Sequence, residues 1–421
     1  MPPADVNRTV EAVWRIESPR LIAGLARTVR DVGLAEDLAQ EALVAALEQW
    51  PRDGIPDNPG AWLMSTARHR GIDRIRREQT GRRKAEELGR DMELRNAELE
   101  RDLAAGIDDP FEGLDDDLLR LVFTACHPVL PTEARVALTL RLLGGLTAPE
   151  IARAYLVTES SVQQRIVRAK RTLKAARVPI EVPGRDELPE RRASVLEVIY
   201  LIFNEGYFPS SGTLTVRTEL LEESMRLGRI LAELMPDEPE VHGLVALMEI
   251  QASRTVARVG PDGEAVPLLE QDRARWNRTL IRRGLDSLER AYATGGSFGP
   301  YSLQGAIAAC HGRARTSEDT DWAQIAALYD GLAQVSPSPV IDLNRAVATG
   351  MAEGPEAALL LLDDPKLDEA LADYALLPAA RADALMRMGR HAEAKSEFER
   401  AAELSENERQ REVLLKRAAA R

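Results

Sequence analysis

Cysteine and aromatic side chains are scarce in this sequence. Its 421 residues include two cysteines, Cys126 and Cys310, and aromatic residues make up 4% of the chain. Two cysteines so far apart form neither a zinc-binding spacing nor a disulfide framework, so we expect no metal and no cofactor. A reducing cytoplasm is the simplest setting for such a chain.

Long apolar runs are also missing. No stretch approaches the roughly 20 apolar residues that a membrane-spanning helix needs, and the opening segment MPPADVNRTVEAVW lacks the apolar core of a signal peptide. We therefore expect a cytoplasmic protein without membrane contact. Sustained alternation of apolar and polar residues is absent too, whereas Ala, Leu, Arg and Glu are abundant, which predicts an all-α protein.

Charge is distributed unevenly along the chain. The formal net charge is −13, which taken alone disfavours binding to nucleic acid. Residues 61–84 and 163–177, however, each carry a net charge of +6, and residues 86–117 between them carry −10. Because charges are screened over about 8 Å at physiological salt, each basic segment can bind phosphate whatever the total charge.

Composition divides the chain into five segments. A compact helical segment is followed by an acidic linker, a second small helical unit, a Pro-rich linker and a long helical extension. In chain order these segments are residues 8–80, 81–116, 117–177, 178–190 and 191–421.

The clearest local pattern is LTAPEIARAYLVTESSVQQRIVRAKRTL, residues 146–173. A short amphipathic helix opens with a capping box of Thr147 and Glu150, and Thr158 can cap a second helix after a tight turn. Two short helices joined in this way, the second one basic, predict a helix-turn-helix that enters the DNA major groove. The buried stripe of the second helix is expected to be Val162, Ile166, Ala169 and Leu173.

The polar face of this second helix supplies candidate DNA contacts. Its N-terminal half can reach base edges, where glutamine pairs with adenine, and its cations suit the phosphates that set the register. The alternative is an ordinary solvated helix face. The expected base readers are Ser160, Ser161, Gln163 and Gln164, and the expected phosphate contacts are Arg165, Arg168, Lys170 and Arg171.

The same segment resembles region 4 of the extracytoplasmic-function sigma factors of the sigma-70 family, which direct RNA polymerase to promoters. Leu156 departs from the family pattern, which usually has glycine there, and a bulky residue makes a left-handed turn conformation costlier. The resemblance implies that this helix reads the −35 promoter element. The residues that carry it are Glu150-Ile151-Ala152, Val157, Val162, Arg165 and Arg168-Ala169.

Residues 33–50, GLAEDLAQEALVAALEQW, resemble the acidic helix of region 2. In the family this helix grips the clamp coiled coil of the polymerase β′ subunit, and Asp37, Gln40 and Glu41 stand at the matching positions. Asp37 and Glu41 are four residues apart, so both carboxylates share one helix face. Two acids on a helix are usually just solvated, and only the resemblance assigns them a partner.

Residues 58–77, NPGAWLMSTARHRGIDRIRR, resemble the family helix that melts DNA and recognises the −10 element. Asn58 could line the pocket for a flipped base, but we favour a helix cap before Pro59. The expected core residues are Trp62, Leu63, Ala67, Ile72 and Ile75. The expected −10 contacts are Asn58, Arg68, Arg70, Arg74, Arg76 and Arg77.

The acidic linker has two interpretations. In the family, the segment between regions 2 and 4 threads toward the RNA exit path of the polymerase, where an acidic chain can mimic nucleic acid. A solubilising tether would have the same composition, and the sequence leaves both open.

The C-terminal extension contains repeated patterns. Residues 375–408 fit the small-large-turn-small-large pattern of tetratricopeptide repeats, a second unit begins near Pro339, and a degenerate third runs through residues 303–314 and 322–339. Such units stack into a curved solenoid with a concave binding surface. The positions that define the two clearer units are Ala382, Leu385, Gly389, Ala394, Phe398 and Ala401, and then Ala346 and Ala358.

Two further segments resemble the subgroup of these sigma factors that carries tetratricopeptide-like extensions. One is Phe203-Asn204-Glu205-Gly206-Tyr207, and the other is GPYSLQGAIAACHGRA, residues 299–314. In that subgroup the extension regulates sigma activity and is needed for it. Helix packing and turn formation are the expected roles of Glu205, Tyr207, His242 and His311, because no metal-binding spacing joins them.

Together, these resemblances imply an alternative sigma factor, not an enzyme, whose extension controls its activity. The expected partners are core RNA polymerase, through the β′ clamp coiled coil and the β flap, promoter DNA, and a protein or small-molecule ligand of the extension. The alternative is a helix-turn-helix regulator with a repeat-based sensor, which would leave the acidic segment 33–50 and the basic segment 61–84 unexplained.

Overall fold

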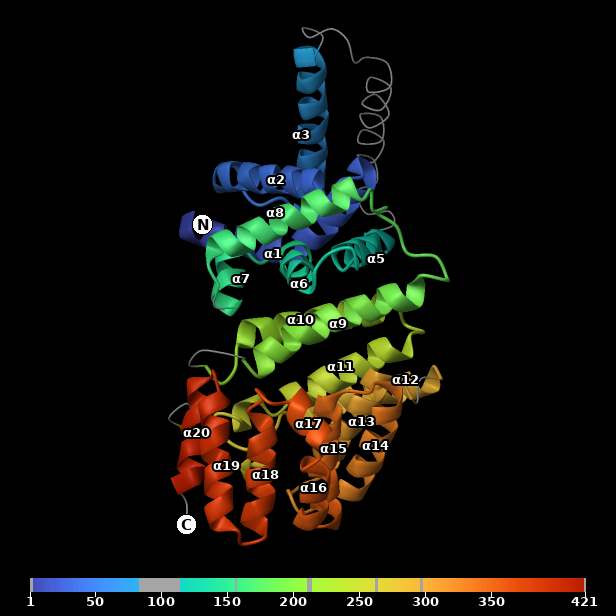
Figure 1. Ribbon diagram of the computed structural model, residues 1–421. Helices are drawn as coiled ribbons and strands as arrows, with labels where there is room; N and C mark the ends of the chain where they lie inside the picture. Colours follow the sequence, from blue (N-terminus) through green and yellow to red (C-terminus); the bar gives the residue numbers. More distant parts are fainter. Residues whose placement is uncertain are drawn as a thin grey trace. The chain divides into compact units, whose positions relative to one another are not determined.

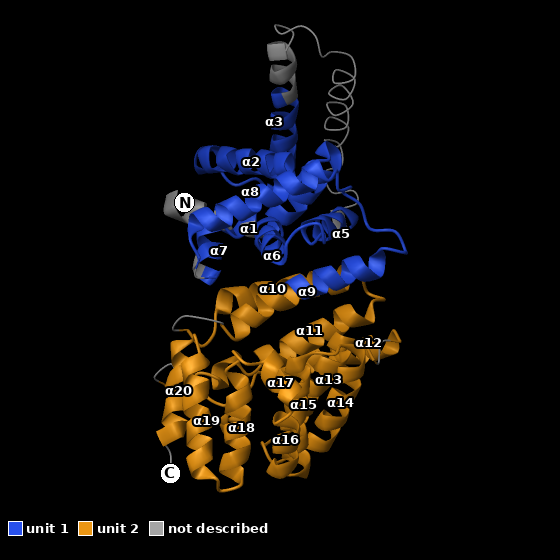
Figure 2. Ribbon diagram, in the orientation of Figure 1, with its two compact units in different colours: residues 1–198 blue, residues 199–421 orange. Residues whose placement is uncertain are grey.

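The computed structural model describes residues 3–82, 114–155, 157–209, 214–261, 264–295 and 298–419. Within these ranges the chain forms α-helices, short 3₁₀ turns and one isolated β-bridge, and no strand, which confirms the all-α prediction. The chain divides into two compact units, residues 1–198 and residues 199–421 (Figures 1 and 2). Most of the predicted acidic linker, residues 83–113, lies outside the described residues.

The N-terminal unit contains helices from both predicted sigma regions (Figure 1). α1, α2 and α3 pack on one another, α5 packs against α1, and α6 and α7 each pack against α8. Their bounds are α1 Pro3–Val29, α2 Val32–Asp53, α3 Pro59–Arg82, α5 Leu114–Ala125, α6 Thr132–Leu142, α7 Ala148–Tyr155 and α8 Glu159–Ala175.

Local side-chain chemistry sets the start of α2. The Asp31 carboxylate accepts hydrogen bonds from the amides of Gly33 and Leu34 at 2.9 and 3.1 Å, which caps the helix. Leu38 and Ala42 are four residues apart on the helix and both are buried, so this face of α2 packs in the core.

Asp117 stands where the acidic segment ends and α5 begins. Its side chain is buried, 3.2 Å from Arg27 Nε and 2.6 Å from Arg120 Nη1. This carboxylate therefore joins α5 to α1 and does not belong to a solvated tether.

The C-terminal unit is a succession of helices that pack on their chain neighbours (Figure 1). The division between the units falls within α9, Leu188–Tyr207. The helices that follow are α10 Thr218–Leu234, α11 Pro239–Ala252, α12 Arg278–Ala293, α13 Pro300–Arg313, α14 Trp322–Val335, α15 Pro339–Glu353, α16 Pro355–Leu362, α17 Pro365–Ala370, α18 Leu376–Arg387, α19 His391–Leu404 and α20 Glu408–Ala419. The 3₁₀ turns are η1 Thr255–Ala257, η2 Leu268–Glu270 and η3 Arg273–Arg275.

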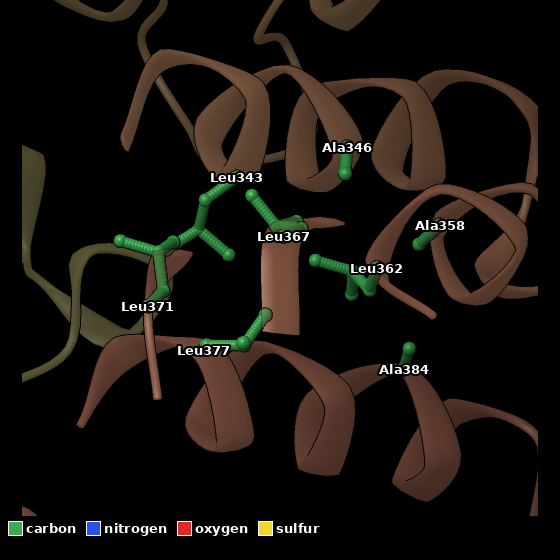
Figure 3. Close-up of a cluster of buried hydrophobic side chains, with 8 residues drawn as sticks. All are labelled: Leu343, Ala346, Ala358, Leu362, Leu367, Leu371, Leu377 and Ala384. Atoms are coloured by element: carbon green, nitrogen blue, oxygen red, sulfur yellow. The ribbon is translucent and has the colours of Figure 1, made fainter. Parts of the chain in front are cut away.

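Each predicted repeat is a pair of helices. The pairs are α18 with α19, α15 with α16, and α13 with α14, in the order in which the sequence indicates them. Gly389 has a φ of 74° in the turn between α18 and α19, a conformation that favours glycine. Figure 3 shows leucines of α15, α16 and the segments that follow pointing toward one another in a shared core. This core contains Leu343, Ala346, Ala358, Leu362, Leu367, Leu371, Leu377 and Ala384.

The two segments that resemble the subgroup with extensions, residues 203–207 and 299–314, have packing roles and are called the landmark segments below. A Cβ at Gly206 would lie 2.6 Å from the backbone nitrogen of Leu221, so only glycine lets α9 approach α10 this closely. In the second segment, the amides of Tyr301 and Ser302 donate hydrogen bonds of 2.8 and 3.0 Å to the carboxylate of Glu240, which belongs to α11. That carboxylate caps the N-terminus of α13.

Candidate nucleic-acid interface

The acidic face of α2 is exposed as the sequence predicts. The side chains of Asp37 and Glu41 are 55% and 45% exposed, and each has an oxygen 3.9 Å from Arg74 Nη1 of α3. Gln40 is half-buried and donates a hydrogen bond of 2.7 Å to Glu36 Oε1. Exposed ion pairs at this distance contribute little stability, so both carboxylates stay available to a partner.

The start of α3 is set by Asn58. Its Oδ1 accepts a hydrogen bond of 3.0 Å from the amide of Ala61, which confirms the predicted cap. Trp62 is half-buried and packs edge-on against Trp50 with ring centroids 5.4 Å apart, while Leu63 is buried. The loop before α3 is thereby held by a cap and an aromatic pair.

Arg68 corrects one prediction about α3. It was expected to face DNA, but it is 2% exposed. Met64 and Ile72, four residues before and after it, are also buried, so Arg68 lies on the core stripe of the helix. Burial, with the charge of Arg27, lowers the pKa of the Arg68 guanidinium, and Asp117 opposes this shift.

Two other cations of α3 are exposed, unlike Arg68. They are Arg70 and Arg74, which lie on the helix surface. The side chains of Ile75, Arg76 and Arg77 lie outside the described residues, so their placement stays a prediction.

The helix-turn-helix has the predicted caps. Glu150 Oε2 accepts a hydrogen bond of 2.7 Å from the Thr147 amide, and the Glu150 amide donates to Thr147 Oγ1 at 3.4 Å. Thr158 Oγ1 accepts from the Ser161 amide at 3.2 Å at the start of α8. The turn position Leu156 lies outside the described residues. Buried on α8 are the four predicted residues Val162, Ile166, Ala169 and Leu173.

The opposite face of α8 is open. Gln163 and Gln164 are exposed, and Gln163 Nε2 donates a hydrogen bond of 2.7 Å to Glu159 Oε1. Ser160, Arg168 and Arg171 are exposed too, and Ser161 and Arg165 are half-buried. The base-reading and phosphate-contacting candidates therefore share one accessible surface, except for Lys170.

Known families match these elements. Residues 14–80 match Sigma-70 region 2, and residues 120–173 match Sigma-70, region 4. SigK of Mycobacterium ulcerans (strain Agy99), an ECF RNA polymerase sigma factor, is 31% identical over 159 residues, which cover 37% of this chain and 78% of SigK. The chain belongs to the ECF RNA polymerase sigma factors. SigK of Mycobacterium tuberculosis (strain ATCC 25618 / H37Rv) is 30% identical over 152 residues, 35% of this sigma factor and 74% of that relative.

The extension of this sigma factor has matches of its own. Residues 191–292 match a family of unknown function, DUF6596. An uncharacterized protein of Rhizobium meliloti (strain 1021) is 42% identical over 394 residues, which cover 92% of this chain and 90% of that protein. The similarity therefore includes both sigma regions and most of the extension.

Membership defines the function at its coarser level. The chain is an alternative sigma factor that directs transcription initiation, and core RNA polymerase and promoter DNA are its partners. The matched sigma regions are not enzyme families.

None of the described helices combines the length and apolar character needed to cross a bilayer. Within the described residues, no three His, Cys, Asp or Glu side chains are arranged to hold a metal ion.

Lys170 of this sigma factor is held by α2. Its Nζ forms an ion pair with Glu36, whose other oxygen lies 2.6 Å from Arg141 Nε. Glu36 is 3% exposed; burial alone would raise its pKa, but the charges of the two cations bring it below the ordinary value. Lys174 Nζ lies 2.7 Å from Asp31 at the start of the same helix. No sequence signal pointed to these pairs, because they join residues more than 100 positions apart.

A cavity of about 880 Å³ adjoins these ion pairs, between the ends of α1 and α8, the start of α2, and α5. Cations outnumber acids in its lining. Two of its arginines, Arg30 and Arg177, adopt left-handed backbone conformations with φ of 53° and 49°.

Proposed function

We propose that this sigma factor holds the polymerase through α2 and reads promoters through α3 and α8, under control of its extension. One observation carries the proposal: an exposed acidic face on α2 and an exposed polar face on α8 occur in one compact unit. A single helix-turn-helix regulator would need only the second of these.

The polymerase contact is assigned to Asp37, Gln40 and Glu41, which would bind the β′ clamp coiled coil, while region 4 would meet the β flap. Two exposed carboxylates on one face suit a basic partner surface, since opposite charges speed and orient association. The bounds 8–80 and 117–177 are proposed for the two sigma domains, with 81–116 and 178–190 as linkers.

The −10 contacts are assigned to the cations of α3 other than Arg68, whose burial removes it from the set, and to Asn58. On α8, the serines and glutamines would read −35 base edges and the arginines would hold phosphates. Lys170 would join them only after leaving Glu36. The −10 set is Asn58, Arg70, Arg74, Arg76 and Arg77, and the −35 set is Ser160, Ser161, Gln163, Gln164, Arg165, Arg168, Lys170 and Arg171.

The extension, residues 191–421, is assigned a regulatory role with a ligand of its own. Stacked helix pairs offer a surface for such a ligand. We further propose that the protein works in the cytoplasm and performs no chemistry itself, since polymerase forms the phosphodiester bonds.

Co-purification with core polymerase tests this function. We expect the double variant Asp37→Asn, Glu41→Gln to lose most of its binding to core polymerase, because both carboxylates of the face become neutral. Asp53→Asn removes one exposed acid from another face of α2 and should bind as the wild type does. Wild-type binding by the double variant would refute the assignment of α2.

A further inference from the structure

Three arginines of the C-terminal unit gather where its two landmark segments meet. Tyr207 closes the first segment, and the guanidinium carbons of Arg258 and Arg254 lie 3.8 and 5.6 Å from the centroid of its ring. His311 belongs to the second segment, and its carbonyl oxygen accepts a hydrogen bond of 3.0 Å from Arg273 Nη1. The cluster therefore connects residues of α9, α13 and the turns after α11.

Aromatic rings line this arginine cluster. The Trp276 ring centroid lies 5.8 Å from Arg254 Cζ and 4.9 Å from Arg273 Cζ. The Phe208 ring lies 5.5 Å from Arg258 Cζ and is 42% exposed, so it marks the side that opens to solvent. Ring faces attract guanidinium groups, but they carry no net charge that could neutralise three of them.

Carboxylates do not balance the cluster. Arg258 and Arg273 are 8% and 3% exposed, and within the described part of the chain neither they nor Arg254 forms an ion pair with an acid. Glu318 and Asp319 attract Arg273 only from the surface. Arg273 also donates hydrogen bonds to the Ala314 carbonyl and to Thr320 Oγ1, but these neutral oxygens do not cancel its charge. A buried charge without a counterion is unfavourable, so this arrangement favours an anion.

Four buried hydrogen-bond positions in the cluster are also unpartnered in the described structure. They are Nε of Arg254, Nε of Arg273, Nε1 of Trp276 and Nδ1 of His311. The first three are obligate donors, and buried donors normally have an acceptor. An oxygen-rich ligand would supply acceptors as well as negative charge.

The positive charge of the arginine cluster shifts the pKa of two neighbouring side chains, Tyr207 and His311. Burial alone would raise the pKa of Tyr207, but the charges of Arg254 and Arg258 and their hydrogen bonds bring it below the ordinary value. Burial, with the charges of Arg254 and Arg273, lowers the pKa of His311 to about 3, so this ring is neutral at pH 7.

We propose that Arg254, Arg258 and Arg273 form a binding site for a small phosphorylated molecule. A phosphate monoester carries about −1.5 to −2 charges at pH 7 and three acceptor oxygens, which match several cations and a set of donors. One guanidinium group can bind two phosphate oxygens at once, through two parallel N–H···O hydrogen bonds. The organic part of the ligand would lie toward Phe208. This site gives the extension a ligand class and does not depend on the promoter contacts proposed above.

Thermal unfolding and calorimetric titration of the full-length protein test the site. The probes are inorganic phosphate and ribose 5-phosphate, with malonate and sodium chloride at equal ionic strength as comparisons. Both phosphates should raise the Tm by several degrees more than chloride does, because a ligand that binds only the folded state stabilises it. Arg254→Gln and Arg258→Gln should each weaken binding about tenfold or more, since each removes a charge-assisted hydrogen bond.

Arg282→Gln, an exposed arginine of α12 outside the cluster, is the matched control and should bind as the wild type does. If circular dichroism shows that an arginine variant does not fold, the titrations of the wild-type protein alone decide whether the site binds phosphate. The proposal is overturned if neither phosphate stabilises the wild type at millimolar concentration, or if both folded variants keep full affinity. Equal affinity for malonate would overturn the assignment to phosphate. Since these titrations contain neither polymerase nor DNA, their failure would leave the promoter function untouched.

Discussion

Backbone strain at Arg30 is a residue-scale feature with a direct test. Its φ of 53° lies in the left-handed region that favours glycine, at the turn between α1 and α2. We expect Arg30→Gly to raise the free energy of unfolding by about 1 kcal/mol, because glycine adopts this conformation without a Cβ clash. Urea unfolding measures the change. Arg30→Ala keeps the strain and loses the same side chain, so an equal gain from alanine would contradict the explanation.

His311 should make stability depend on pH. Its pKa is about 3 in the folded protein, because of burial and the charges of Arg254 and Arg273, against 6.5 when unfolded. The unfolded chain therefore binds the extra proton first, and stability is complete above pH 6.5 and falls as the pH drops toward 3. Between pH 7.5 and 5.5 we expect a loss of about 1.4 kcal/mol.

Urea unfolding of the C-terminal unit in phosphate-free buffer, at both pH values, measures this loss. His311→Gln cannot titrate and should lose that part of the pH dependence. An identical pH dependence in the variant would show that other groups cause it.

Single residues also show where sequence reasoning succeeds. The caps at Asn58, Thr147 and Thr158 were predictable, because a cap depends on residues within three positions of it. The burial of Arg68 was missed although its spacing from Met64 and Ile72 indicated it. The resemblance to a DNA-binding helix favoured an exposed cation there, and the core stripe decided otherwise.

At the scale of elements, α8 separates two kinds of DNA contact. Arg168→Gln should weaken holoenzyme binding to all promoters alike and lower the salt slope by about 1, since it removes one phosphate contact. Gln164→Ala should instead change the base preference within the −35 element. Binding at two salt concentrations to promoters with single −35 substitutions measures both, with Arg283→Gln of α12 as the control. A change of base preference in Arg168→Gln alone would reverse the two assignments.

The contact between α2 and α8 depends on Glu36. In Lys170→Gln this buried carboxylate would keep one cation, Arg141, and the hydrogen bond from Gln40. We expect the free energy of unfolding to fall by about 1–3 kcal/mol, because the second cation is lost. Arg171→Gln, the exposed neighbour, should leave it nearly unchanged. Urea unfolding compares the two variants, and equal stability would show that the pair contributes nothing.

Elements with local signals were predictable, and elements held by distant partners were not. The helix-turn-helix and the three helix pairs follow from caps and apolar spacing within short windows. The buried pairs of Glu36 and the Glu240 cap on α13 join segments far apart in the chain, where spacing carries no information. The arginine cluster was missed for the same reason, although Tyr207 and His311 lie in segments that the sequence marked.

At the scale of the whole molecule, the Pro-rich segment 178–190 was expected to separate the sigma domains from the extension. The first half of α9 nevertheless packs on the N-terminal unit. Arg191 Nη2 donates to the Phe123 carbonyl at 2.8 Å, and Ser194 Oγ donates to the Cys126 carbonyl at 2.6 Å. A truncation near Pro179 would remove both bonds.

We therefore expect a chain ending at Pro179 to unfold several degrees below one ending at Val198, since a few kcal/mol of contacts are lost. Thermal unfolding of the two truncated chains measures the difference. Equal Tm values would mean that α9 adds nothing to the N-terminal unit.

Transcription from genomic DNA with core polymerase and this sigma factor tests the central claim most directly. We predict new RNA 5′ ends that share common −10 and −35 elements, that require the sigma factor, and that disappear with the double variant Asp37→Asn, Glu41→Gln. Identical 5′ ends with and without the protein, together with no affinity for core polymerase, would contradict its function as a sigma factor.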